Sequence, residues 1–164
     1  MSYKILLVVP FISLLFGCVE VKPYDYTEYK KSIPKSILVL PPVNSSVDLN
    51  ATYSILSTVS FPLAEAGYYV LPVALVDETF KQNGVTVPDE MHAIDLKKLN
   101  EIFGADAVLY IKVEEYGVKY KIIRSDVDVK LSAKLVNSSS DLTVWEGSAF
   151  ASSGYRMHTS FLCS

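Results

Sequence analysis

The sequence contains few of the residues on which catalytic, metal and redox sites depend. Its 164 residues include two cysteines and two histidines, and His92 and His158 lie too far apart to show metal-ligand spacing. Nucleotide-binding, metalloprotease and serine-hydrolase motifs are absent. Fifteen Lys and Arg against eighteen Asp and Glu give a net charge of −3, which argues against a nucleic-acid partner. We therefore expect no enzyme, no metal site and no catalytic residue.

One long apolar run is present, over residues 5–16 at the N-terminus. It follows Lys4 and is typical of a secretory signal, too short to span a bilayer comfortably. Gly17 and Cys18 then complete a bacterial lipobox, although Phe16 departs from the small residue usual there. This pattern predicts cleavage between Gly17 and Cys18, a diacylglycerol thioether on the Cys18 sulfur and an acyl chain on the new amino group. An ordinary cleaved signal or an uncleaved anchor are the alternatives.

The residue after the lipidated cysteine gives an expectation about localisation. Val19, rather than an aspartate, follows Cys18, which favours sorting to the bacterial outer membrane with the protein facing the periplasm. The membrane would then be contacted through two or three acyl chains, which hold a protein effectively permanently. No other cofactor is expected. With Cys18 acylated, Cys163 would be a lone thiol.

We divide the chain into a signal peptide (1–17), a lipidated tether (18–34), one α/β domain (35–153) and an irregular tail (154–164). The tether mixes charge, proline and tyrosine without helical or strand periodicity. Its tyrosines Tyr24, Tyr26 and Tyr29 would either rest at the lipid headgroups or pack along the edge of the domain.

The first half of the domain predicts a β-α-β-α-α-β order. A buried strand at 35–40 ends at Pro41 and Pro42, a second, short strand is expected at 68–71 and a third strand at 105–115. Helices are expected at 51–66, 75–83 and 95–103, with loop at 84–91. Asn50 is the expected N-cap of the first helix, and Pro62 is expected to kink it or split it after Val59.

The second half predicts an antiparallel hairpin. Apolar residues alternate with polar ones over 126–135, so one face should be buried and the other wet. A polar loop at 137–141 leads to a last strand at 142–151. The fold class is therefore α/β, with a mixed sheet of about five strands, parallel in its first half and covered by helices.

In open α/β sheets ligands bind beyond the carboxyl ends of the parallel strands. Here these ends lead into loops 41–50 and 72–74. The candidate partner or ligand residues in and after these loops are Pro41, Pro42, Val43, Asn44, Pro72, Asp77 and Glu78. Asp77 and Glu78 also fit a structural role, because acidic residues at a helix start favour the helix dipole.

Five separated blocks carry a resemblance. They run from Pro23 to Tyr26, Lys35 to Asn44, Pro62 to Val70, Pro72 to Phe80 and Ile102 to Ala107. Together they resemble the domain-of-unknown-function 799 family of bacterial lipoproteins, whose members resemble the amino-terminal domain of TolB and the periplasmic domain of the curli secretion lipoprotein CsgG. The tail at 154–164 departs from the family, whose members continue past the last strand, and looks truncated.

The resemblance implies an outer-membrane lipoprotein that takes part in an envelope transport or assembly complex. Its partners would be envelope proteins such as CsgG-like or transporter subunits, or further copies of itself, and the family provides no catalytic residues. The alternative is a periplasmic binding module for a peptide or glycan that uses loops 41–50 and 72–74. Catalysis is the third hypothesis.

Overall fold

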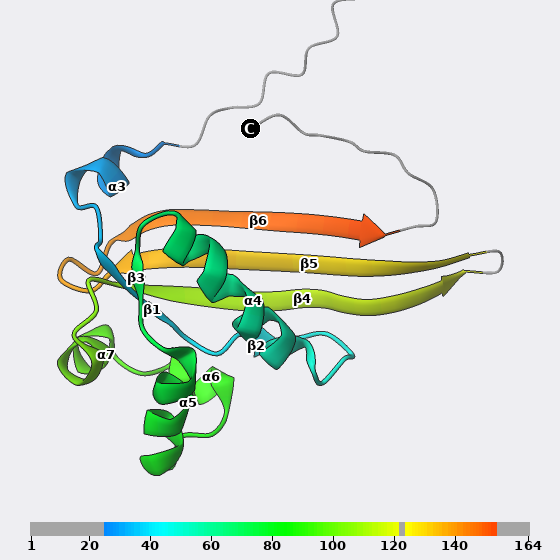
Figure 1. The fold of residues 1–164 in the computed structure, drawn as a ribbon, viewed down its shortest axis with the longest axis horizontal. Helices are drawn as coiled ribbons and strands as arrows, with labels where there is room; N and C mark the ends of the chain where they lie inside the picture. Colours follow the sequence, from blue (N-terminus) through cyan, green and yellow to red (C-terminus); the bar gives the residue numbers. More distant parts are fainter. Residues whose placement is uncertain (1–24, 122–123, 154–164) are drawn as a thin grey trace, which may run out of the picture.

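The computed structural model describes residues 25–121 and 124–153 (Figure 1). Gly17, Cys18 and the tail at 154–164 lie outside the described residues. The elements follow in the order α3 (Thr27–Lys31), β1 (Ser36–Val39), β2 (Val43–Asn44), α4 (Ala51–Glu65), β3 (Tyr69–Val70), α5 (Val73–Gln82), α6 (Pro88–His92), α7 (Leu96–Phe103), β4 (Ala107–Lys121), β5 (Arg124–Asn137) and β6 (Thr143–Ser153).

The strands form one mixed sheet in the order β3-β1-β4-β5-β6, and β2 also pairs with β4. β1 pairs parallel with β3 and β4, and β2 pairs parallel with β4. β4, β5 and β6 form long antiparallel ladders. The predicted fold class is confirmed, with six strands where about five were expected. The additional strand, β2, is a two-residue pairing that continues along β4 after Pro41 and Pro42.

Two layers of helices cover opposite faces of the sheet. Ile37 and Val39 of β1 face one core cluster, against which α4 and Tyr29 of α3 pack. Leu38 and Leu40 face a second cluster, formed with Val76 and Phe80 of α5, Met91 of α6 and Leu99 of α7. Because successive side chains of a strand point to opposite faces, the apolar run predicted to be buried on both sides is buried in this way.

The helix ends follow local signals at α7 more closely than at α4. Asp95 caps α7 by accepting a hydrogen bond from the Lys97 N–H at 2.8 Å, and Gly104 ends it with φ of 64°. Asn50 precedes α4 without a side-chain cap. The predicted split after Val59 is wrong, because α4 continues through Pro62. Pro62 lies in the last turn, and packing of Val59 and Leu63 on the first cluster holds the helix on both sides of it.

Two short helices were missed. α3 lies within the segment expected to be irregular, and Tyr29 packs against the first core cluster. Tyr29 therefore packs along the domain, as one of the two alternatives proposed. α6 overlaps the end of the expected loop at 84–91, and its start signals are Pro88 at the first position and the acidic Asp89 and Glu90.

The predicted burial of β5 is wrong at its N-terminal end. Val127 was expected inside but is 40% exposed, whereas Asp126 and Asp128 are 2% and 8% exposed. The ends of β4, β5 and β6 farthest from α3 run past every described helix (Figure 1). Nothing described covers the apolar face there, while the Ser45–Val47 segment lies near Asp128 on the other side.

Within the described ranges no helix is long and apolar enough to cross a membrane.

Candidate functional site

A deep apolar groove lies between α3, α4 and the sheet face formed by β4, β5 and β6. Its volume is about 840 Å³. α4 forms one wall and α3 closes one end, while the sheet forms the floor. The lining residues are Tyr26, Tyr29, Ile37, Ile55, Thr58, Val59, Pro62, Leu63, Tyr68, Leu109, Ile111, Leu131, Ser132, Ala133, Leu135, Trp145, Gly147, Ser148 and Ala149. No Asp, Glu, Lys or Arg is among them, so the groove favours an apolar occupant.

Small residues of β6 form part of the groove floor. Gly147 and Ala149 follow Trp145 on the same face of the strand. The Trp145 ring lies along the strand over Gly147, so a Cβ on Gly147 would stand 2.7 Å from Trp145 Cζ2. The missing side chain of Gly147 therefore makes room for the indole ring.

Tyrosines form the end of the groove at α3. The Tyr29 and Tyr68 hydroxyls are hydrogen bonded to each other, and the Tyr26 and Tyr29 rings make an edge contact with centroids 6.4 Å apart. The bond to Tyr68, together with burial, raises the pKa of Tyr29 to about 12. Tyr29 therefore stays neutral at physiological pH, and the hydroxyl pair fastens the segment before β1 to the start of β3.

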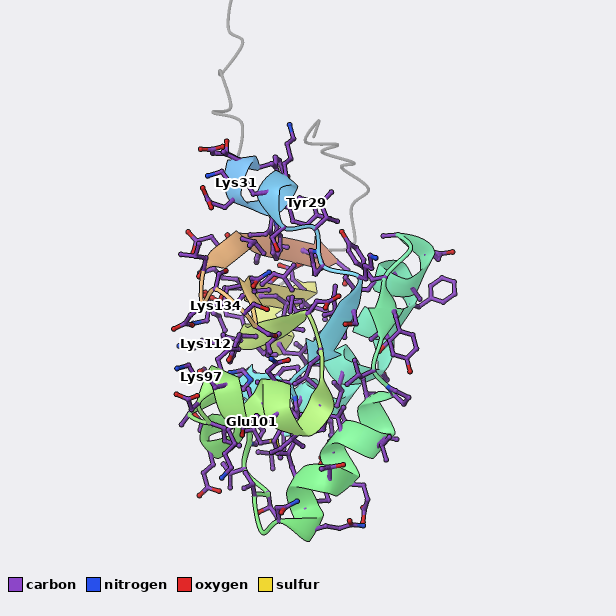
Figure 2. All side chains as sticks on the ribbon, turned by 90° about the vertical axis from the view of Figure 1, so that its left-hand side faces the viewer. Tyr29, Lys31, Lys97, Glu101, Lys112 and Lys134 are labelled. Carbon is purple, nitrogen blue, oxygen red and sulfur yellow. The ribbon has the colours of Figure 1, made fainter. Side chains whose placement is uncertain are left out.

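A second, more polar groove of about 670 Å³ lies on the opposite face of β4, β5 and β6. Lys134 Nζ lies 4.9 Å from the centre of the Tyr110 ring, and His92 contacts the same ring edge-on. Figure 2 shows Lys134, Lys112 and Lys97 on one side of the molecule, from β5, β4 and α7.

His92 connects this second groove to the loop after β1. Its Nε2–H donates to the Pro41 carbonyl at 2.9 Å. Burial lowers the pKa of His92 despite that bond, which acts in the opposite direction. The ring is therefore held neutral. His92 lies in the last turn of α6.

The structure does not bring the predicted loop residues into one site. Pro41 and Pro42 are buried, Val43 lines the second groove, and the Asn44 side chain shapes its own loop by bonding Ser46 N and Asp48 O. Pro72 borders a separate hollow of about 500 Å³. Residues 73 and 74 begin α5 and are not loop. A role of these residues in binding stays a prediction.

Asp77 and Glu78 do not begin a helix. α5 starts at Val73, two residues before the expected start, so both carboxylates lie in its second turn. Asp77 pairs with Lys81 at 2.6 Å, and Glu78 accepts from the Gln82 amide at 3.0 Å. These are i, i+4 contacts along an exposed helix face, where such pairs stabilise a helix only weakly.

Charged side chains elsewhere form surface pairs. Glu114 and Lys130 lie 2.6 Å apart across β4 and β5, and this contact lowers the pKa of Glu114. Among residues 25–121 and 124–153, no three His, Cys, Asp or Glu side chains are grouped so that they could hold a metal ion. What the apolar groove between α3, α4 and the sheet offers a binding partner is therefore the burial of apolar groups.

The sequence indicates one strand of the groove floor, β5, but not the strand beside it. The alternation at 127–135 correctly identified one apolar face of β5. The small residues of β6 that lie beside this face, Gly147 and Ala149, could be placed there only once the pairing of β5 with β6 was known.

Comparison with known proteins identifies relatives. Residues 24–161 match the family model described as "Putative lipoprotein GNA1162-like". The chain is 52% identical over 126 residues to "Putative lipoprotein NMB1124/NMB1162" of Neisseria meningitidis serogroup B. This match covers 77% of the chain, which spans only 59% of that relative's length.

Solved structures agree with the fold. Lipoprotein GNA1162 from Neisseria meningitidis superimposes with a TM-score of 0.72 at 50% identity, over 77% of this chain and 88% of that one. The PelC dodecamer from Paraburkholderia phytofirmans gives 0.52 at 16% identity, over 76% of this chain and 75% of that one. The LpoB C-terminal domain from Salmonella enterica gives 0.52 at 16% identity, over 87% and 93%. The last two show likeness of fold alone. By the family match and its close relatives, the chain belongs to the GNA1162-like lipoprotein family.

Proposed function

We propose that this chain is a non-catalytic lipoprotein, held by acyl chains on Cys18 in the bacterial outer membrane and facing the periplasm. In this proposal it is a component of an envelope transport or assembly complex. It acts by binding a partner protein in the apolar groove between α3, α4 and strands β4, β5 and β6.

The observation that carries this proposal is the groove itself. A hollow of about 840 Å³ without a charged lining residue is open at the surface of a chain with 20% charged residues. The apolar face continues from the groove toward exposed Val127 at the far end of the sheet. Contiguous apolar surface of this kind marks interaction sites in soluble domains.

The family membership supports the lipid anchor, since the family is described as lipoproteins. The fold also occurs in PelC, which forms a dodecamer, so this architecture is compatible with large assemblies. The likeness to TolB and CsgG, and the identity of the partner, stay predictions.

A binding module for a peptide or glycan is the second candidate. The second groove favours it, because Val43 from the loop at 41–50 lines that groove beside Lys112 and Lys134. The two lysines and the Tyr110 ring would suit an anionic group of a polar ligand, and Glu146, which also lines the groove, would suit a hydrogen-bond donor of it. Under this alternative, the polar groove rather than the apolar one would be occupied.

Co-purification from the native envelope in mild detergent tests the leading proposal. The wild-type chain should recover a stoichiometric partner, and Cys18→Ala should lose it. Ala149→Glu places a charge on the groove floor and should also lose it. Ala64→Glu makes the same change on the exposed face of α4 and should retain it. Recovery of the chain alone, or full retention by Ala149→Glu, would contradict the proposal.

A further inference from the structure

The strand β6 is the outermost strand of the sheet on the side of the groove. It is last in the strand order, and β5 pairs with one side of it. No other strand in residues 25–121 and 124–153 pairs with its outer side. Figure 1 shows α3 near one end of β6 and no described helix along the rest of that edge. An edge strand offers a row of backbone N–H and C=O groups on its free side.

This edge has few of the features with which proteins protect exposed strands. β6 is eleven residues long and contains no proline or lysine, and Glu146 is its one charged residue. The ladder between β5 and β6 shifts register only at Leu135/Val136, near the start of β6. From Trp145 to Ser153, nine consecutive pairs are regular, a length of about 30 Å. Short edges, bulges and charges are the usual safeguards against added strands.

The side chains of β6 leave room for a neighbour on the groove side. Beyond Trp145 that face carries Gly147, which the Trp145 ring covers, and then the small residues Ala149, Ala151 and Ser153, which leave the room. The residues between them, Ser148, Phe150 and Ser152, point to the other face. A strand laid beside β6 would therefore place every second side chain beside the groove, where the small residues leave space for large apolar groups.

We propose that the partner of the groove binds as an extended segment that adds a strand to the outer edge of β6, with large apolar side chains at every second position. This inference rests on the proposed function and specifies the chemistry of the partner. The backbone groups of β6 fix the segment's direction and register, and the groove selects its alternate side chains.

A peptide probe tests the inference directly. The probe has nine residues that alternate leucine and threonine, flanked by one lysine at each end. The control peptide has the same sequence with N-methyl groups on alternate residues, so that one edge cannot pair. The mature lipidated chain in mild detergent is followed by amide hydrogen exchange. The probe should slow exchange of the β6 amides by about tenfold or more, and the control peptide should not.

A pair of proline variants then shows which edge is used. Ser148 and Ala149 are neighbours on β6, so the N–H of one points to β5 and the N–H of the other points outward. Ser148→Pro and Ala149→Pro should differ accordingly. One should lower the melting temperature by breaking the ladder to β5, and the other should melt close to wild type but no longer bind the probe. Ser148→Ala keeps the N–H and should bind.

Several results would overturn the inference. These are protection by both peptides alike, no protection of β6, or probe binding by the proline variant that melts like wild type. Protection of β6 that rises with protein concentration in the absence of the probe would show instead that a second copy occupies the edge. If the native partner still co-purifies with that same proline variant, the strand-addition inference fails while the proposed function stands.

Discussion

Replacement of Gly147 by alanine should move the Trp145 ring and weaken the fold. The added Cβ would stand 2.7 Å from Trp145 Cζ2 and 3.2 Å from Cη2, whereas ordinary contact begins near 3.4 Å. The ring must therefore retreat by about 0.7 Å at Cζ2. Because it lies on the groove floor, it can only move outward, toward solvent or into the groove.

The energetic cost follows from two opposing effects. Overpacking of this kind costs about 1–3 kcal/mol. Removing a glycine from a strand returns about 0.5–1 kcal/mol, since alanine loses less backbone freedom on folding. The net loss is about 1 kcal/mol in the free energy of unfolding, which corresponds to a decrease of about 3–5 °C in melting temperature for a domain of this size.

Intrinsic fluorescence reads the change directly, because Trp145 is the single tryptophan of the chain. The emission maximum of Gly147→Ala should move to longer wavelength as the ring becomes more exposed. Ser148→Ala is the matched control, since it alters the neighbouring residue and leaves the position under the ring unchanged. Wild-type emission together with a wild-type melting temperature in Gly147→Ala would refute the packing argument.

Two further predictions concern groups that hold the loops. Asp106 Oδ2 accepts the Lys35 and Ser36 N–H groups at 2.8 and 3.0 Å, which lowers the pKa of its carboxyl below 3.8. Asp106→Ala should therefore lose about 1–2 kcal/mol in denaturant unfolding at neutral pH, and this difference should disappear as the pH falls well below about 4. Equal stability of the variant and the wild type at pH 7 would contradict the bond's role. His92 has a pKa below 6.5 through burial, so its contribution to stability is complete above about pH 6.5 and is lost as the pH falls through its folded pKa. Between pH 8 and pH 5 the melting temperature should fall more steeply for the wild type than for His92→Gln. Parallel curves of melting temperature against pH would be evidence against this contribution of His92.

The sequence predicted the elements whose signals are local. The apolar run of β1 determines its conformation within a few residues and was correctly predicted as a strand. The helix expected at 95–103 is present as α7, but Asp95 stands just before it as the N-cap. The polar loop between β5 and β6 was also predicted. Its signal is local, since Asn137 Oδ1 closes the loop by accepting hydrogen bonds from Ser139 N and Ser140 N.

The errors arose where tertiary packing decides. Pro62 favours a break when α4 is considered alone, yet packing around it holds the helix. The alternation in β5 predicted which residues share a face, but it could not predict which face is covered. Asp126 and Asp128 are buried and Val127 is exposed, and the Ser45–Val47 segment lies near Asp128. The groove required contact between α3, α4 and strands far apart in the sequence. No single segment encodes that contact.

The position of β1 has a mechanical consequence. The N-terminal segment enters the sheet through β1, which is hydrogen bonded in parallel to β3 on one side and β4 on the other. A pull along β1 on the chain that precedes it would therefore load two parallel ladders in shear, so that several hydrogen bonds must fail together rather than one at a time. The Asn137 Nδ2 bond to Ser32 Oγ, at 2.8 Å, joins the same segment to the β5–β6 loop. Such a load would enter the sheet at β1, while β6 lies at the opposite edge of the sheet from β3, so the proposed binding edge would be kept apart from the loaded strands.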